Sequence, residues 1–220
     1  MAGHRFRSLL APGAPVWMLN PGGASLDVVD LLARSGVRCL FIECERTAVH
    51  VESVTALVRC AHSHGMAALL RSESMAPEIL VRYLDRGIDG LVVPHTETVA
   101  ELQAIGEVVR YVTKGAPERC FAVAHIESAA AAEHIEALAA SRDVDGFLIG
   151  PNDLSHSLGF AGDTSRPELV AAVDRVAETP RGRRRIAAVV ATATVLVGVV
   201  VWLFGSTPPE VARPANVASL

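Results

Sequence analysis

Hydrophobic and polar positions along this chain form two alternating kinds of segment. Short apolar runs bounded by Gly, Pro or charged residues are typical of strands buried on both faces of a parallel sheet. Longer segments with apolar residues three and four positions apart are typical of amphipathic helices. The expected strands are 16–19, 38–42, 67–70, 90–93, 120–126 and 146–149. The expected helices are 25–35, 51–64, 76–86, 98–111, 128–140 and 167–177.

This alternation of strands and helices indicates βαβ crossovers and therefore a parallel sheet. A closed (β/α)8 barrel has eight such units in typically about 250 residues. An open doubly wound sheet is the alternative, but it gathers its chemistry at one switch point rather than at the ends of many strands. We therefore expect an α/β fold over residues 1–178, a TIM-type barrel truncated to about six βα units.

The pattern changes after residue 178. Residues 179–185 form a basic linker, and residues 186–204 then run without a charged residue or a Pro. This length is close to the roughly 20 residues that cross a bilayer as a helix, and the preceding arginines suit a cytoplasmic flank. One buried strand or a core helix is the alternative, because valines are frequent in the run. We expect a hydrophobic transmembrane helix that anchors the chain in the membrane, followed by a disordered tail at 205–220.

Composition and charge narrow the classes of function. The chain has 220 residues, half of them hydrophobic, which is enough for one domain with a sizeable core. A net charge of −4 gives no electrostatic support for a nucleic-acid partner. The four cysteines form no C-x-x-C pair, as expected for reduced thiols of a cytoplasmic catalytic domain.

Two acidic residues, Glu127 and Asp153, stand where an expected strand ends. The carboxyl ends of parallel strands meet on the face where α/β barrels carry their active sites. Two carboxylates there could share one divalent cation. Alternatively, each could cap the helix that follows, since an acidic residue at a helix start is stabilising.

Four segments around these positions resemble those of one enzyme family. They are Leu70-Arg71, Leu84-Asp85-x-Gly87 with Gly90-Leu-Val-Val-Pro94, Ile126-Glu127, and Phe147-Leu-Ile-Gly-Pro-Asn-Asp-Leu-Ser155 with Leu158-Gly159. In this order they are similar to segments of the HpcH/HpaI aldolases, class II pyruvate aldolases of the phosphoenolpyruvate/pyruvate superfamily of barrels. The resemblance covers about residues 16–178.

The resemblance implies a metal-dependent mechanism. Glu127 and Asp153 would bind Mg2+ or Mn2+, which chelates a pyruvyl group and stabilises its enolate. Arg71 would stabilise the developing oxyanion through its planar fork of donors. The turn containing Gly150, Asn152 and Asp153 would receive the substrate carboxylate. The family also implies a homo-oligomer.

The second strand departs from the family pattern. The family has D-x-E-H there, with the histidine as general base, whereas this chain has Glu43-Cys-Glu45-Arg46. Arginine cannot accept a proton near neutral pH. An ion pair between Arg46 and Asp85 could replace the family's His–Asp pair, and Glu45 could orient a metal-bound water. Glu43 is expected on the opposite side of the strand, solvated or paired.

A replacement base has several candidates. His95 follows the fourth expected strand and is the strongest of them, and His125 lies on the same strand face as Glu127. His50 and His156, in loops near other strand ends, are weaker candidates.

Three functions remain open. The first is a metal-dependent carbon–carbon lyase, aldolase or decarboxylase, that acts on a pyruvyl-type 2-keto acid through a metal-stabilised enolate. Decarboxylation of a diacid such as oxaloacetate needs little enzyme base, whereas aldol cleavage needs a proton removed from the substrate hydroxyl. The second is an acyl-CoA lyase similar to the citrate-lyase β-subunit or malyl-CoA lyase. The third is an inactive, membrane-tethered remnant that binds a partner or a ligand.

Overall fold

The sheet of this protein closes into a barrel in the strand order β1-β2-β3-β4-β5-β6-β7-β8. The computed structural model describes residues 4–10, 16–178, 187–193 and 196–202. The strands are β1 Val16–Leu19, β2 Cys39–Glu43, β3 Ala67–Arg71, β4 Gly90–Val93, β5 Phe121–Ile126, β6 Gly146–Ile149, β7 Ala187–Ala193 and β8 Leu196–Trp202. The strands expected from the sequence correspond to β1 to β6, so the predicted α/β class with six parallel strands is confirmed, and the arrangement is consistent with a TIM-type barrel.

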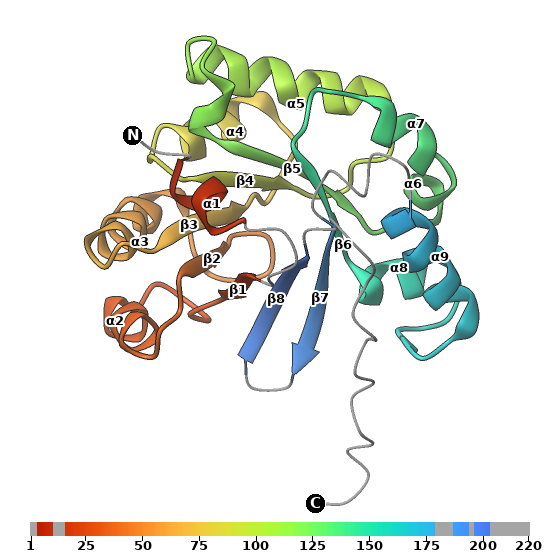
Figure 1. Cartoon of the computed structure of the whole chain (residues 1–220), viewed down its shortest axis with the longest axis horizontal. Helices are drawn as coiled ribbons and strands as arrows, with labels where there is room; N and C mark the ends of the chain where they lie inside the picture. Colours follow the sequence, from red (N-terminus) through yellow and green to blue (C-terminus); the bar gives the residue numbers. More distant parts are fainter. Residues whose placement is uncertain (1–3, 11–15, 179–186, 194–195, 203–220) are drawn as a thin grey trace, which may run out of the picture.

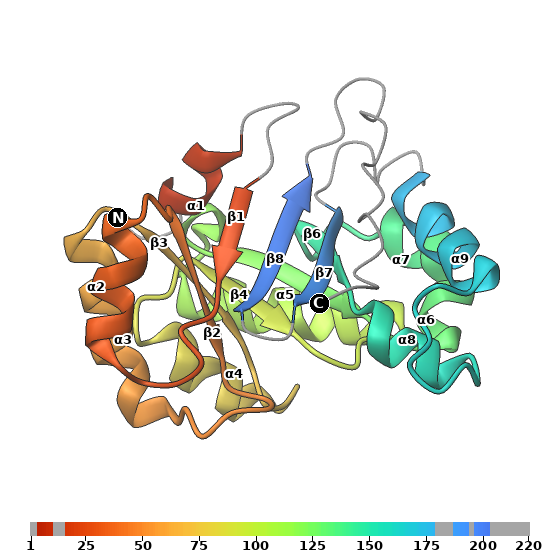
Figure 2. The ribbon, with the colours of Figure 1, turned by 90° about the horizontal axis from the view of Figure 1, so that it is seen from below.

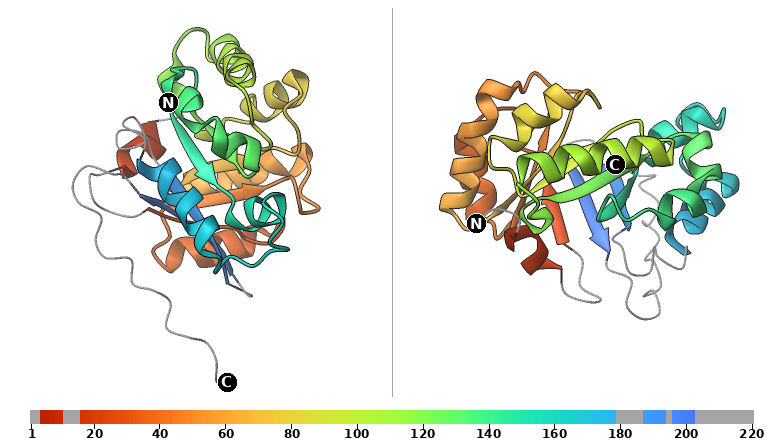
Figure 3. Two further views of the ribbon diagram at one scale, coloured as in Figure 1. Left: turned by 90° about the vertical axis from the view of Figure 1, so that its right-hand side faces the viewer. Right: turned by 90° about the horizontal axis from the view of Figure 1, so that it is seen from above.

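Apart from α1, which precedes β1, the helices lie on the outer side of the sheet (Figure 1, Figure 3). The helices are α1 His4–Leu9, α2 Leu26–Arg34, α3 Val51–Ser63, α4 Pro77–Leu84, α5 Val99–Val112, α6 Ala129–Glu133, α7 Ile135–Ala140, α8 Pro151–Ser157 and α9 Pro167–Glu178, with a 3-10 turn at Pro117–Arg119. Local signals explain several boundaries. Ser25 caps α2, and Thr98 with Glu101 forms a capping box at α5. The helix expected at 128–140 is divided into α6 and α7 at His134.

The hydrophobic segment near the C-terminus forms strands, not the expected helix. Within 186–204, β7 and β8 pair antiparallel with each other, and β8 also pairs antiparallel with β1 (Figure 2). Antiparallel strands can be joined by a hairpin of two residues, so a run of this length can supply two strands. The frequent valines also favour strands. Among the described residues, no helix is long and apolar enough to cross a membrane. The predicted linker 179–185 and tail 205–220 lie outside the described residues.

One end of the barrel is closed by α1. Phe6 is buried there and meets Phe121 of β5 edge-on, with ring centroids 5.0 Å apart. Arg7 lies over the Phe121 ring and pairs with Asp145, just before β6. Because Phe121 is the first residue of β5, this closed end is the amino-terminal end of the strands. The carboxyl-terminal ends are therefore the face on which a site can form.

Strand residues alternate between the barrel interior and the layer of helices. Cys39 and Phe41 of β2, with Leu69 of β3, belong to the interior cluster, whereas Leu40 and Ile42 belong to the cluster packed on the helices. Since side chains repeat their direction every second residue, the strand ends carry this alternation into the site. The interior-facing positions become charged at the last residues of β2 and β3 and at the residue that follows β5.

Candidate active site

Three interior-facing residues at the carboxyl-terminal ends of strands are charged. Glu43 ends β2, Arg71 ends β3, and Glu127 follows β5 directly. Glu43 and Arg71 are partners in the β2–β3 register, so their side chains lie side by side. Glu43 and Glu127 are only 5% and 4% exposed. Buried charges at this density need partners or a ligand, because desolvation disfavours isolated charges.

Arg71 pairs with two carboxylates of the second strand end. Its Nη2 pairs with Glu43 Oε2, and its Nε lies 3.1 Å from Glu45 Oε2. The other oxygen of Glu43 accepts the backbone N–H groups of Glu45 at 2.8 Å and Arg46 at 3.4 Å. Glu43 thus fixes both the guanidinium of Arg71 and the turn after β2.

The prediction that Glu43 points away from this face was wrong. Glu43 follows Phe41 by two residues, so both side chains face the barrel interior. The period of the strand was the signal that could have placed it.

Glu127 is held by two histidines. Its Oε2 lies 2.8 Å from His125 Nδ1, and its Oε1 accepts the backbone N–H of His95 at 2.7 Å and lies 2.9 Å from His95 Nδ1. Burial alone would raise the pKa of Glu127, but the hydrogen bonds and charges of His125 and His95 outweigh it and lower the pKa to about 2. The carboxylate is therefore ionised at neutral pH despite its burial.

His95 bridges Glu127 to Glu45. Its Nε2 lies 3.0 Å from Glu45 Oε1 while Nδ1 faces Glu127, and its side chain is 61% exposed. Its backbone has φ 56°, in the left-handed region, which costs a non-glycine residue about 1–3 kcal/mol. The interactions with the two carboxylates hold the residue in that conformation. One ligand atom each from Glu45, His95 and Glu127 lies within 4.8 Å of the others.

Arg46 and Asp153 form a separate ion pair at this face. Arg46 Nη2 lies 2.8 Å from Asp153 Oδ1, and this hydrogen bond raises the pKa of Arg46. The expected pair between Arg46 and Asp85 is not formed. Asp85 is exposed and caps the carboxyl end of α4, five residues before β4 begins, and so lies toward the opposite end of the strands. A helix that leads into a parallel strand ends near the amino-terminal face, which is why that prediction was wrong.

The turn after β6 is packed tightly against the histidines. A Cβ built on Gly150 would lie 2.6 Å from His125 Nε2 and 3.2 Å from Glu127 Cβ, so only glycine fits there. Asn152 is exposed in the first turn of α8, and Asp153 follows it. The predicted role of this turn in binding a substrate carboxylate stays a prediction, as does the role of Asp153 as a metal ligand.

The donor set fits a divalent cation with a preference for oxygen. Glu45 Oε2 and Glu127 Oε2 are both buried, and they face Arg71 Nε at 3.1 Å and His125 Nδ1 at 2.8 Å. Carboxylate oxygens at this density suit Mg2+ or Mn2+, and one imidazole is also compatible with Mn2+.

Comparison with known proteins agrees with this geometry. A model of the HpcH/HpaI aldolase/citrate lyase family matches residues 18–199. A pyruvate aldolase of Rhizobium etli is 26% identical over 181 residues, which cover 72% of this chain and 70% of the relative.

Solved structures show the same fold. A HpcH/HpaI aldolase/citrate lyase family protein of Burkholderia cenocepacia superimposes with a TM-score of 0.77 at 22% identity and covers 88% of this chain and 86% of that one. The citrate lyase beta subunit of M. tuberculosis, solved with oxaloacetate and magnesium, has a TM-score of 0.50 at 16% identity and covers 77% of this chain and 75% of that one.

Proposed function

Because this chain belongs to the HpcH/HpaI aldolase/citrate lyase family, we propose that it is a divalent-metal-dependent carbon–carbon lyase acting on a pyruvyl-type 2-keto acid. Within that class, the site favours decarboxylation of a 2-keto diacid over aldol cleavage. One observation carries the proposal: Glu127 is buried, its pKa is lowered to about 2, and its carboxylate lies in a group with Glu45 and His95 whose ligand atoms are within 4.8 Å of one another.

Glu127 and Asp153 would hold the cation, with Glu45 as a neighbouring carboxylate. Glu127 is already ionised, so no proton has to leave before it binds a metal. Asp153 first has to exchange its contact with Arg46 for the cation. A bound Mg2+ or Mn2+ would supply a Lewis acid that stabilises the negative charge on the keto oxygen during bond cleavage. The pyruvate aldolase relative and the oxaloacetate- and magnesium-bound neighbour support this choice of substrate and metal.

Arg71 would stabilise the same oxygen. Its guanidinium is fixed by Glu43 and Glu45, and its side chain is 12% exposed. A donor held rigid before the reaction needs no reorganisation when charge develops on the oxygen. Its two carboxylate partners keep the local charge negative enough to attract a cation as well.

The proton chemistry distinguishes the two reactions. Arg46 stands where the family has its base, and a guanidinium cannot accept a proton from a substrate hydroxyl. Both ring nitrogens of His95 lie within 3.0 Å of a carboxylate oxygen, and the side chain is 61% exposed. In decarboxylation the C–C bond to the leaving carboxylate breaks and CO2 is released. The electron pair of that bond stays on the pyruvyl fragment, which becomes an enolate. His95 would then donate a proton to the enolate carbon, and no base is required.

The test compares two substrates on the wild type and on two variants of Arg46. Wild type with Mn2+ is expected to release CO2 from oxaloacetate faster than it cleaves a 4-hydroxy-2-oxo acid. Arg46→His restores a base at the family's position, so the ratio of aldol cleavage to decarboxylation should rise by about 100-fold or more. Arg46→Gln, which removes the charge without adding a base, is the matched control.

Two results would overturn the proposal. Decarboxylation that is unchanged by a chelator, or unchanged in Glu127→Gln, would remove the metal assignment. Efficient aldol cleavage by the wild type would show that another group supplies the base, and His95→Gln would then identify whether His95 is that group.

A further inference from the structure

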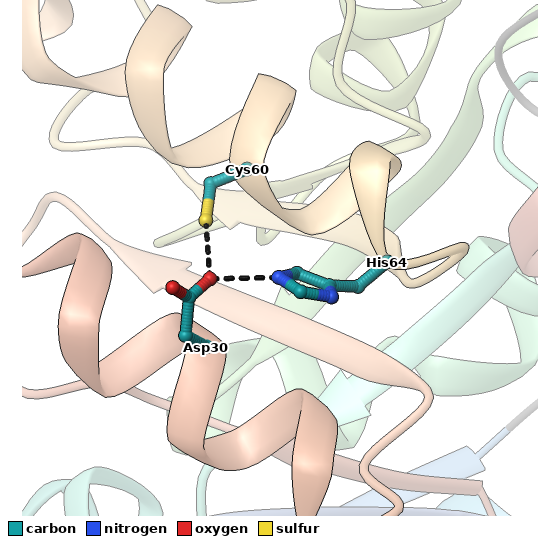
Figure 4. A group of neighbouring side chains, drawn as sticks. All are labelled: Asp30, Cys60 and His64. Atoms are coloured by element: carbon teal, nitrogen blue, oxygen red, sulfur yellow. Dashed lines mark hydrogen bonds and ion pairs between the residues drawn. The ribbon is translucent and has the colours of Figure 1, made fainter.

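A second cluster of metal-binding side chains lies outside the barrel, between α2 and α3 (Figure 4). Asp30 lies on α2 and Cys60 lies on α3. His64 is the residue that caps the carboxyl end of α3. Cys60 and His64 are four positions apart, so they lie on one face of the helix. Asp30 Oδ1 lies 3.3 Å from Cys60 Sγ and 2.7 Å from His64 Nε2.

The cluster is far from the candidate active site along the strand direction. His64 stands three residues before β3 begins, so it lies near the amino-terminal end of the strands. Glu127 lies at the carboxyl-terminal end. The side chains of His64 and Asp30 are 34% and 40% exposed, which leaves a path for an ion from solvent.

We propose that Asp30, Cys60 and His64 form a binding site for Zn2+ or a similar borderline-soft divalent cation. Their three ligand atoms already lie within 4.8 Å of one another. In a tetrahedral zinc site with bonds of about 2.0–2.3 Å, ligand atoms are about 3.3–3.6 Å apart. The sulfur–oxygen distance is already close to that value, and the nitrogen–oxygen distance has to open by about 0.6 Å. A fourth position remains for water, because the partly exposed Asp30 and His64 leave one side open.

A nucleophilic or redox-active role for the Cys60 thiol agrees less well with these contacts than metal binding does. Burial, followed by the hydrogen bond to Asp30, raises the pKa of Cys60, so the reactive thiolate is disfavoured. His64 Nε2 contacts Asp30 and therefore does not serve as a base for the thiol. A bound cation would reverse this situation, since coordination stabilises the thiolate directly.

The two sites of this chain differ in donor chemistry. Carboxylate oxygens dominate around Glu127 and suit Mg2+ or Mn2+, whereas the thiolate of Cys60 with an imidazole selects zinc. A cation at this site would link α2 to α3 through one ligand from α2 and two from the end of α3. We therefore infer a structural role, in which the metal stabilises this part of the outer helical layer.

Cobalt spectroscopy on the full-length protein tests the site, because only a thiolate ligand produces an intense sulfur-to-cobalt charge-transfer band. The probe is Co2+ alone, followed by displacement with Zn2+. Wild type should develop the band at one equivalent and lose it when Zn2+ is added. Cys60→Ser should abolish the band. His64→Gln should weaken binding by more than about 100-fold, since even loss of an outer-shell partner costs about 10–100-fold.

Matched variants keep the result interpretable. Asp27→Asn, on an exposed position of α2, and His134→Gln, on an exposed position between α6 and α7, should leave the band unchanged. Circular dichroism and thermal unfolding confirm that Cys60→Ser folds, and Zn2+ should raise the Tm of wild type but not of that variant.

Two outcomes would overturn the inference. A band that persists in Cys60→Ser would place the thiolate elsewhere in the chain. The absence of a band in folded wild type with excess Co2+ would show that the three residues form only a hydrogen-bonded cluster.

Discussion

Replacing Glu127 with glutamine keeps the shape of the side chain and removes its charge. The pKa of this carboxyl is lowered from an ordinary value of 4.5 to about 2, with His125 and His95 outweighing the opposing effect of burial. At about 1.4 kcal/mol per pKa unit, the ionised carboxylate stabilises the folded protein by about 3 kcal/mol. Glu127→Gln should therefore lower the free energy of unfolding by about that amount near pH 6.

The pH dependence of this loss follows from the sign of the shift. A lowered pKa in the folded state contributes stability that is complete above the unfolded-state pKa and disappears as pH falls through the folded-state pKa. The difference between wild type and Glu127→Gln should be full above about pH 5.5 and fall to about 1 kcal/mol near pH 3.

Urea unfolding of both proteins without added metal, at several pH values, measures this difference. The control is Glu133→Gln, an exposed glutamate on α6, which should change stability by less than about 0.5 kcal/mol. A Glu127→Gln protein as stable as wild type near pH 6 would refute the reasoning. So would a difference that grows as the solution becomes more acidic.

Three further substitutions test other contacts of the site. Arg71→Lys keeps the charge but loses the fork that contacts Glu43 and Glu45, and steady-state assays should show kcat reduced by about 100-fold or more. Gly150→Ala places a methyl group against His125, and denaturant unfolding should show a loss of about 1–3 kcal/mol. Arg46→Ala releases Asp153, and calorimetry should show Mn2+ binding tightened by about two- to fivefold, the equivalent of a partly exposed ion pair.

Local pattern in the sequence was sufficient to place the first six strands and the helices between them. The same pattern put Glu127, Arg71 and His95 at strand ends, because a strand's length and its two-residue period are local properties. The two-residue period also predicts that Glu43 points into the barrel, because Glu43 follows the inward-facing Phe41 by two residues. The prediction nevertheless assigned Glu43 to the opposite side of the strand.

The pairing of these residues depended on closure of the barrel. Arg46 contacts Asp153 across 107 positions of sequence, and His95 joins Glu45 to Glu127. No periodic pattern encodes such contacts, since they depend on which strands become neighbours and in which register.

The last apolar segment and the cluster of Asp30, Cys60 and His64 show the same difference between what the sequence determines and what the tertiary structure decides. The sequence of residues 186–204 gave length and hydrophobicity, which a membrane helix and a strand hairpin share, and pairing of β8 with β1 distinguished them. The four-residue spacing of Cys60 and His64 is visible in the sequence, but only the packing of α2 on α3 brings Asp30 to them. Sequence therefore determined the elements and the chemistry each carries, while the tertiary structure decided the partners, because contacts between distant residues arise only when the chain folds.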